Sequence, residues 1–139
     1  MKRKIIGFLV CTLLITTFIP LSVSSEVDKT TTLEILSIFG GFFIIKSLIK
    51  NTGPCETENF IWHMDVDKSN LSWSIGSHSS HKHSGTNLDP YEIRIYKTSW
   101  DNSNFGFGRI YVNVTVFADN ADIVWREEEG FVIGPFVII

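Results

Sequence analysis

In the stretch Ile110-Tyr-Val-Asn-Val-Thr-Val-Phe117, branched apolar residues alternate with a second set that contains both polar and aromatic residues. Side chains of a β-strand point alternately to opposite faces, so this period of two predicts a strand with one buried and one wet face. The branched apolar set that we place on the buried face is Ile110, Val112, Val114 and Val116. The alternating polar set includes Asn113, which we place on the outward face.

The same period recurs between turn signals along most of the remaining chain. It is present over residues 43–50, 60–66, 71–76 and 91–96, and a final stretch over 123–139 is interrupted at Gly130 and at Gly134-Pro135. No window shows a sustained helical period with caps. About seven short strands, separated by turns at regular spacing, predict an all-β antiparallel sandwich. The apolar run 33–49 contains Glu34 and Lys46, and charge inside lipid is costly, so we interpret it as one or two buried strands and not as a membrane span.

The N-terminus has the three parts of a secretory signal peptide. Met1-Lys-Arg-Lys4 is cationic, residues 5–21 are uncharged and apolar, and Val23-Ser-Ser25 places small residues before Glu26. We therefore expect a signal peptide over residues 1–25, a linker over 26–32 and one domain over 33–139, secreted or held at the cell surface. The alternative is an uncleaved anchor, although the apolar run falls just short of the roughly 20 residues that a spanning helix needs.

Charge and cysteine content limit the partners. Three of the 12 basic residues lie in the signal segment, which leaves nine against 15 acidic residues and a formal charge near −6. Binding to nucleic acid requires clustered Lys and Arg, so we expect no nucleic-acid partner and instead an unknown protein or surface partner. Cys11 lies in the signal segment, so only Cys55 remains after cleavage and no intrachain disulfide is expected.

Two stretches carry expectations about the core. Trp62 shares its register with Phe60, Met64 and Val66, so we expect it between the sheets. The C-terminal residues 130–139 are nearly all apolar, and an exposed tail of this kind would favour aggregation. We therefore expect a terminal strand, with Pro135 at a sheet edge or bulge. The alternative is a free strand that completes a sheet in a partner.

The one unusual local feature is a histidine-rich segment over residues 76–85. Its candidate metal ligands are His78, His81 and His83, because imidazole binds Zn²⁺, Cu²⁺ and Ni²⁺. The segment is rich in Ser and Gly and has no nearby carboxylate in sequence, so the alternative is a flexible polar loop with solvated histidines. Residues 65–70 lack the Gly and the bidentate Glu of a calcium loop and predict a hairpin turn. The run 127–129 predicts a solvated acidic loop.

Catalytic motifs are absent from the sequence. It contains no G-x-S-x-G elbow, no phosphate-binding glycine loop and no H-E-x-x-H pair, so we expect neither an enzyme nor a cofactor. Asn70-Leu-Ser72 and Asn113-Val-Thr115 are N-glycosylation sequons, which makes the chain a candidate glycoprotein.

Several segments taken in order resemble the CARDB-like, immunoglobulin-type repeats of exported archaeal-type surface proteins. The resemblance covers most of residues 41–139 and rests on Gly41–Gly53 with its closing Lys-Asn-Thr-Gly, Asn59-Phe-Ile-Trp62, Leu88-Asp-Pro-Tyr-Glu92, Phe105–Thr115 and Gly130–Val137. Tyr91 replaces the turn glycine of that pattern, and the histidine-rich segment is not part of it. The resemblance implies an immunoglobulin-like sandwich that acts as a structural or adhesive module outside the cell, without catalysis.

Overall fold

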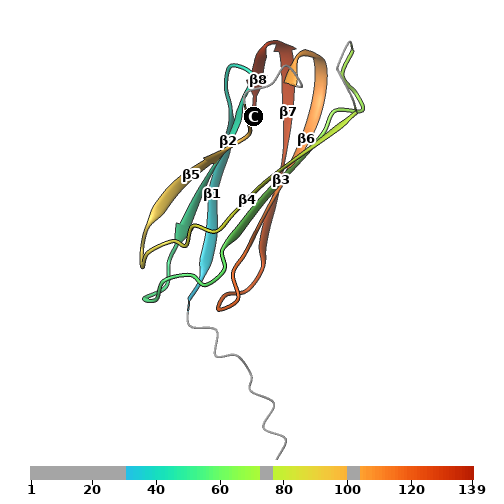
Figure 1. The fold of residues 1–139 in the computed structure, drawn as a ribbon. Coiled ribbons are helices and arrows are strands. Elements are labelled where there is room, and N and C mark those ends of the chain that lie inside the picture. Colours follow the sequence, from blue (N-terminus) through green and yellow to red (C-terminus); the bar gives the residue numbers. More distant parts are fainter. Residues whose placement is uncertain (1–30, 73–76, 100–103) are drawn as a thin grey trace, which may run out of the picture.

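The computed structural model describes residues 31–72, 77–99 and 104–139. These residues form strands and turns and no helix (Figure 1). The described part of the chain therefore has no helix with the length and hydropathy of a bilayer crossing. The signal peptide predicted over residues 1–25, with its cleavage site, lies outside the described residues, as does the predicted linker up to residue 30.

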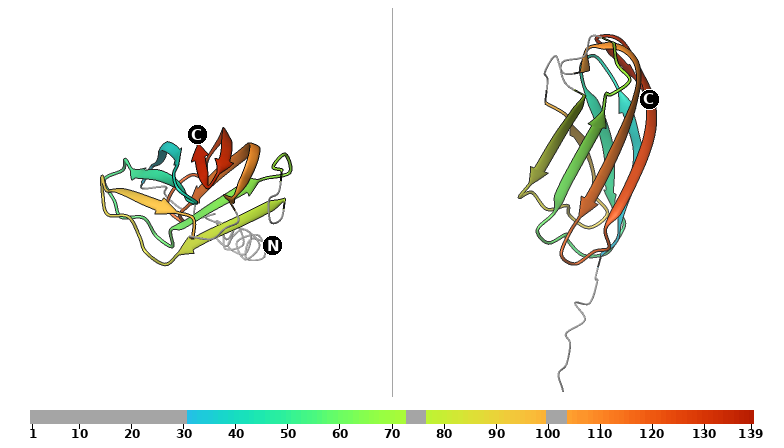
Figure 2. Two further views of the ribbon diagram at one scale, coloured as in Figure 1. Left: turned by 90° about the horizontal axis from the view of Figure 1, so that it is seen from above. Right: turned by 90° about the vertical axis from the view of Figure 1, so that its right-hand side faces the viewer.

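The strands form two antiparallel sheets (Figures 1 and 2). The small sheet has the order β1-β2-β5, with β1 (Leu33–Gly40), β2 (Ile45–Asn51) and β5 (Ile93–Lys97). The large sheet has the order β4-β3-β6-β7-β8, with β4 (His78–Ser84), β3 (Ile61–Asp67), β6 (Gly106–Phe117), β7 (Val124–Gly134) and β8 (Phe136–Ile138). The all-β, antiparallel class predicted from the alternation is confirmed, and the apolar run 33–49 forms β1 and β2.

The core lies between the two sheets and follows the predicted period of two. The apolar set of β6 is buried with at most 1% of each side chain exposed. It packs against the buried residues of the other strands, which include Ile35, Ile38, Ile45, Ile49, Met64 and Val66. Burial of branched apolar side chains on both inner faces is the main force that holds two sheets together.

Trp62 joins the two sheets. Its side chain is 2% exposed, which confirms the predicted core position. The indole Nε1 of this β3 residue donates a hydrogen bond of 2.7 Å to Ser47 Oγ on β2. Its ring stacks on Tyr96 of β5, with 5.6 Å between ring centroids. A buried indole N–H needs an acceptor, and Ser47 supplies it inside the core.

The C-terminal residues are tied down, as predicted. Gly134 has φ +60 and allows a tight turn into β8, which pairs with β7. Phe43 N donates to Pro135 O (2.7 Å) and Val137 N donates to Gly41 O (2.9 Å), so β8 also holds the segment that follows β1. Val137 is buried. A Cβ on Gly40 would collide with the Val137 carbonyl oxygen, so this close approach requires glycine.

The acidic run 127–129 is part of β7, and the predicted loop is wrong. Arg126 reaches the neighbouring β1, whose register shifts between Ile35 and Ser37. Its Nη1 donates to Ile35 O (3.1 Å) and Leu36 O (2.9 Å), while Glu128 Oε1 accepts from its Nε (2.8 Å). The Arg126 guanidinium, which Glu128 holds in place, therefore satisfies backbone carbonyls where β1 lies against β7.

The orientation of β5 is the reverse of the one its apolar residues suggest. Ile93 and Ile95 are more than half exposed, whereas Tyr96 is 6% exposed and faces the interior. The phenol ring packs on Phe60 and Trp62 and so buries more apolar surface than an isoleucine would. Of the strand predicted over 71–76, the structure describes Leu71 and Ser72, and Ser72 forms a single bridge with Phe107; residues 73–76 lie outside the described residues.

Candidate functional site

The histidine-rich segment is a strand, and its interpretation as a flexible loop is wrong. Residues 78–84 form β4, which pairs with β3 along its whole length at one end of the large sheet. Serine and histidine occupy both faces of β4, so no apolar alternation marks it in the sequence. Polar and charged side chains are common on edge strands, where they discourage pairing with other chains.

The pairing register separates the three candidate metal ligands. His81 lies opposite Met64 and His83 opposite Trp62, on the side of the core, whereas His78 lies opposite Asp67 on the outer side. Among the residues that the structure describes, no three His, Cys, Asp or Glu side chains are grouped so that they could hold a metal ion. The geometry therefore gives no support to a site made by His78, His81 and His83.

We accordingly expect Zn²⁺ to bind this domain more weakly than about 10 µM, because convergent ligands on one face are what a tight zinc site requires. Isothermal calorimetry on the wild type and on the His78→Ala/His81→Ala/His83→Ala variant should give indistinguishable heats. Stoichiometric, submicromolar binding that disappears in the variant would instead support the metal-binding alternative.

A different cluster lies on the outer face of β3 and β4. Asp65 Oδ2 is 3.3 Å from His63 Nδ1, and Asp65 Oδ1 is 3.4 Å from His78 Nε2. His63 Nε2 also lies 2.7 Å from Ser80 Oγ. The order Ser80–His63–Asp65 is that of a hydrolase triad. These side chains lie on an open sheet face, and those of both histidines and Asp65 are at least a third exposed. Water weakens such exposed pairs, so we assign the cluster no catalytic role.

The two sequons occupy different environments. Asn70 is exposed in the turn that follows β3, where Ser69 N donates to Asp67 Oδ1 (2.8 Å) and lowers the pKa of Asp67. β3 and β4 pair antiparallel, but residues 65–67 belong to β3, so of the turn predicted over 65–70 only Ser69 and Asn70 are turn residues. Asn113 is on the outward register of β6, as predicted, and its Oδ1 accepts a hydrogen bond of 3.2 Å from Thr115 Oγ1. Glycosylation at either sequon stays a prediction.

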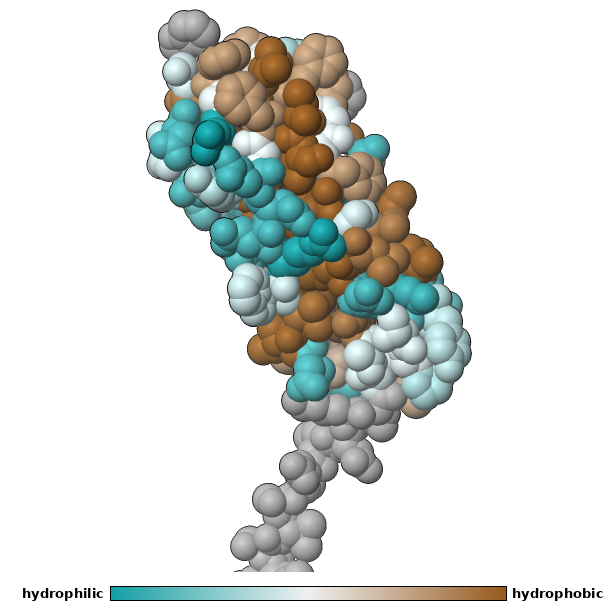
Figure 3. All heavy atoms as spheres, turned by 180° about the vertical axis from the view of Figure 1, so that it is seen from behind, coloured by the Kyte–Doolittle hydropathy of each residue, from teal (hydrophilic) through white to brown (hydrophobic). Residues whose placement is uncertain are grey.

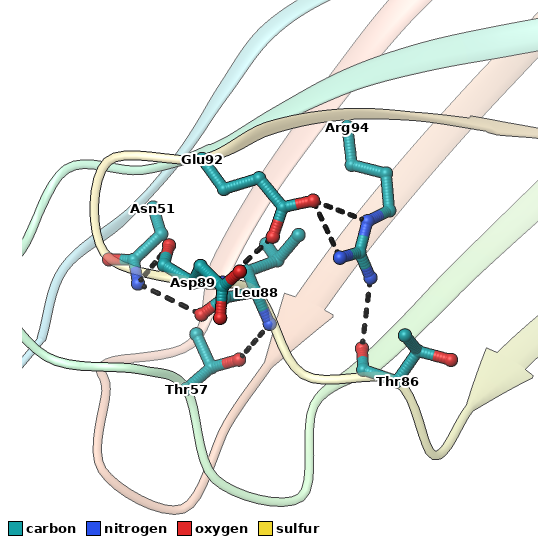
Figure 4. A network of polar contacts seen from close by, with 7 residues as sticks. All are labelled: Asn51, Thr57, Thr86, Leu88, Asp89, Glu92 and Arg94. Atoms are coloured by element: carbon teal, nitrogen blue, oxygen red, sulfur yellow. Dashed lines mark hydrogen bonds and ion pairs between the residues drawn. The ribbon is translucent and has the colours of Figure 1, made fainter.

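A polar network fixes the loop that leads into β5 (Figure 4). Asn51 Nδ2 donates to Leu88 O (3.3 Å) and Asp89 O (3.1 Å). Glu92 accepts from Asp89 N (2.8 Å) and from Arg94 Nε (2.8 Å). Burial acts to raise the pKa of Glu92, but these donors outweigh it and hold the pKa below its usual range. The Arg94 guanidinium is therefore held in a fixed orientation.

Arg94 lies in the wall of a cavity of about 430 Å³ between β4 and β5. The cavity, which we call the flank slot, is lined by Trp62, His83, Thr86, Arg94, Ile95, Tyr96 and Lys97. Burial raises the pKa of Tyr96, and the nearby Arg94 opposes that shift. The Tyr96 hydroxyl is buried beside the Arg94 guanidinium, and no group among the described residues accepts a hydrogen bond from it. Sequence reasoning missed the slot because its residues come from three strands and a loop.

The second notable surface is apolar and lies at the end of the domain opposite the start of β1 (Figure 1), where Figure 3 shows apolar residues gathered. Cross-strand pairs align Phe107 with Ile133, Ile133 with Phe136 and Phe131 with Ile138. A bridge adds Phe42 beside Phe136. We call this surface the distal apolar face; its residues are Phe42, Phe107, Phe131, Ile133, Phe136 and Ile138, of which all but Phe131 are between 47% and 56% exposed.

No family model matches this chain, and a search of curated proteins found none that is similar to it.

Proposed function

We propose that this chain is an exported, non-catalytic structural module of immunoglobulin-like type that assembles with a second copy of itself through the distal apolar face. The immunoglobulin-like type is supported by the strand order, in which β1-β2-β5 faces β4-β3-β6-β7, and by the resemblance to CARDB-like repeats. Export is supported by the three-part N-terminal signal pattern.

The distal apolar face is the observation that carries this proposal. Large apolar side chains that are scattered singly on a surface need no explanation, but a contiguous group is typical of an interaction site. Here six such side chains lie side by side on β6, β7, β8 and the segment after β1. Burial against a partner would remove this surface from water, which is the main driving force of association.

Charge at the border of the face favours a second copy as the partner. Arg109 Nη1 and Glu129 Oε1 lie 3.1 Å apart beside Phe131, and both side chains are more than half exposed. In a twofold dimer the same patch occurs on both subunits. Arg109 of one copy can then pair with Glu129 of the other, so the surface is complementary to itself in charge as well as in apolar character.

The test is the oligomeric state of the chain as recovered after export, measured by sedimentation equilibrium. We expect reversible dimers, and we expect Phe107→Ser and Phe136→Ser each to weaken dimerisation at least tenfold, because burial of a Phe side chain contributes about 1.5–3 kcal/mol. The matched control is Trp125→Ser on β7, because Trp125 is 67% exposed but lies outside the distal apolar face. A wild type that stays monomeric, or a control that dissociates as much as the two variants, contradicts the proposal.

A further inference from the structure

The flank of the domain between β4 and β5 has features that the proposed assembly does not use. β5 is the last strand of the small sheet and pairs only with β2 among the described residues. Asn51 N donates to Glu92 O, and Thr98 N donates to Ile45 O, at the two ends of this pairing. Backbone groups in an antiparallel pair alternate in direction, so every second residue of β5 turns its N–H and C=O away from β2. These residues are Ile93, Ile95 and Lys97.

The free backbone edge runs along the flank slot, to whose lining Ile95 and Lys97 belong. Inside the slot, the Tyr96 side chain is 6% exposed, and its hydroxyl, which lies beside Arg94, has no hydrogen-bond acceptor in the described ranges. A buried hydroxyl proton without an acceptor is costly, and native structures rarely leave one unsatisfied. The fixed guanidinium of Arg94 lies in the same wall. A ligand that presents an oxygen acceptor, above all a carboxylate, would satisfy both groups.

The surroundings are basic although the chain as a whole is acidic. On the two neighbouring strands, Lys97 lies opposite Lys46, and Ile93 lies opposite Lys50. The outer face of β5 adds two apolar side chains, Ile93 and Ile95, each more than half exposed. A strand laid beside β5 would turn alternate side chains towards the slot and towards these isoleucines.

We propose that the flank between β4 and β5 binds an extended peptide segment in which acidic and apolar residues alternate. The peptide adds to β5 as a further antiparallel strand, through the N–H and C=O groups of Ile93, Ile95 and Lys97. One carboxylate enters the flank slot and accepts a hydrogen bond from the Tyr96 hydroxyl, and the apolar side chains cover Ile93 and Ile95. Addition of a strand to an exposed sheet edge is a recurrent mode of peptide recognition.

The probe is an acetylated, amidated heptapeptide of alternating Val and Glu, with the same peptide carrying Lys in place of Glu as its comparison. Binding to the ¹⁵N-labelled chain, as recovered after export, is followed by NMR and amide hydrogen exchange. We expect the Glu peptide to bind, to protect the amides of Ile95 and Lys97, and to shift the Tyr96 resonances. The Lys peptide should bind at least tenfold more weakly.

Two proline variants form a matched pair. Ile95→Pro removes a free-edge donor of β5 without removing a hydrogen bond to β2, and proline is tolerated at such edge positions. Lys82→Pro is the equivalent change on β4. The bond from Lys68 N to Ser77 O sets the alternation along β4, so Lys82 turns its N–H away from β3. We expect Ile95→Pro to abolish binding and Lys82→Pro to retain it.

Tyr96→Phe removes the hydroxyl alone and should weaken binding of the Glu peptide about tenfold, in line with the loss of a hydrogen bond to a charged group. This variant and the amide protection pattern keep the test decisive if Ile95→Pro does not fold. Absence of binding, equal binding of the Lys peptide, an unchanged affinity for Tyr96→Phe, or protection of the β4 edge in place of β5 would each overturn the proposal.

Discussion

Replacement of Trp62 with alanine is expected to lower the free energy of unfolding by about 3–5 kcal/mol. The change removes the largest fully buried side chain of the core. It also leaves Ser47 Oγ without the indole donor at 2.7 Å and removes the ring that stacks on Tyr96. A loss of this size is a large part of the total stability of a domain of this length, which is roughly 5–15 kcal/mol.

Urea denaturation of the wild type and of Trp62→Ala measures the effect. Trp125→Ala is the control, because the same residue type is removed from a side chain that is 67% exposed. We expect the control to change stability by less than about 1 kcal/mol, as is usual for surface substitutions. Equal midpoints for the wild type and Trp62→Ala would mean that Trp62 does not contribute to the core in solution.

Deletion of residues 134–139 is the second large effect, with an expected loss of several kcal/mol, since each large apolar side chain that becomes unburied contributes about 1.5–3 kcal/mol. The deletion removes the buried side chain of Val137. It also removes two backbone hydrogen bonds, one from Phe43 N to Pro135 O and one from Val137 N to Gly41 O. The pairing of β8 with the end of β7 is lost as well, and β7 then pairs with β6 alone.

Phe136→Ser separates stability from assembly in this experiment. Phe136 is 55% exposed, so the substitution should leave β8 paired and thermal stability nearly unchanged while it weakens dimerisation. Thermal melts together with sedimentation distinguish the two roles. A truncated chain with unchanged stability and lost self-association would show that the C-terminal residues act as a docking strand and not as part of the core.

The central strands could be predicted from sequence, and the physical reason is their burial on one face. β3 and β6 pair with strands on both sides, so their inward residues must be apolar and their outward residues contact water or neighbouring polar side chains. The sequences around Trp62 in β3 and Val114 in β6 therefore alternate regularly between inward and outward residues. The same reasoning located the C-terminal strand, because an apolar stretch such as residues 130–139 is stable only when it is covered.

The flanks of the sheets could not be predicted in the same way. β4 carries polar residues on both faces, β5 exposes Ile95 and buries Tyr96, and Arg126 sits on the core side of β7 because β1 offers its carbonyls there. In each case the deciding partner is distant in sequence. Hydrophobic periodicity describes one strand at a time and contains no information on these partners.

The candidate sites depend on pairing registers for the same reason. His63 and His78 meet at Asp65 only because β4 folds back on β3, and Tyr96 reaches Trp62 only because the two sheets face each other. The sequence did identify the histidines as unusual. Their spacing places His81 and His83 on one face of any extended segment, but without an apolar alternation the sequence did not show that residues 78–84 form a strand.

The two ends of the described chain would respond differently if the domain were pulled from both of them. Thr31 precedes β1 at one end, and β8 folds back from the turn at Gly134 at the other (Figure 1). Tension between Thr31 and Ile139 would therefore peel the few bonds of β8 one after another. The load would then pass to β1, which pairs with β2, and to β7, which pairs with β6. The backbone hydrogen bonds of these pairs lie perpendicular to the strands, so several of them must break together when the strands slide past each other. The domain would lengthen slightly at low force and then resist further extension.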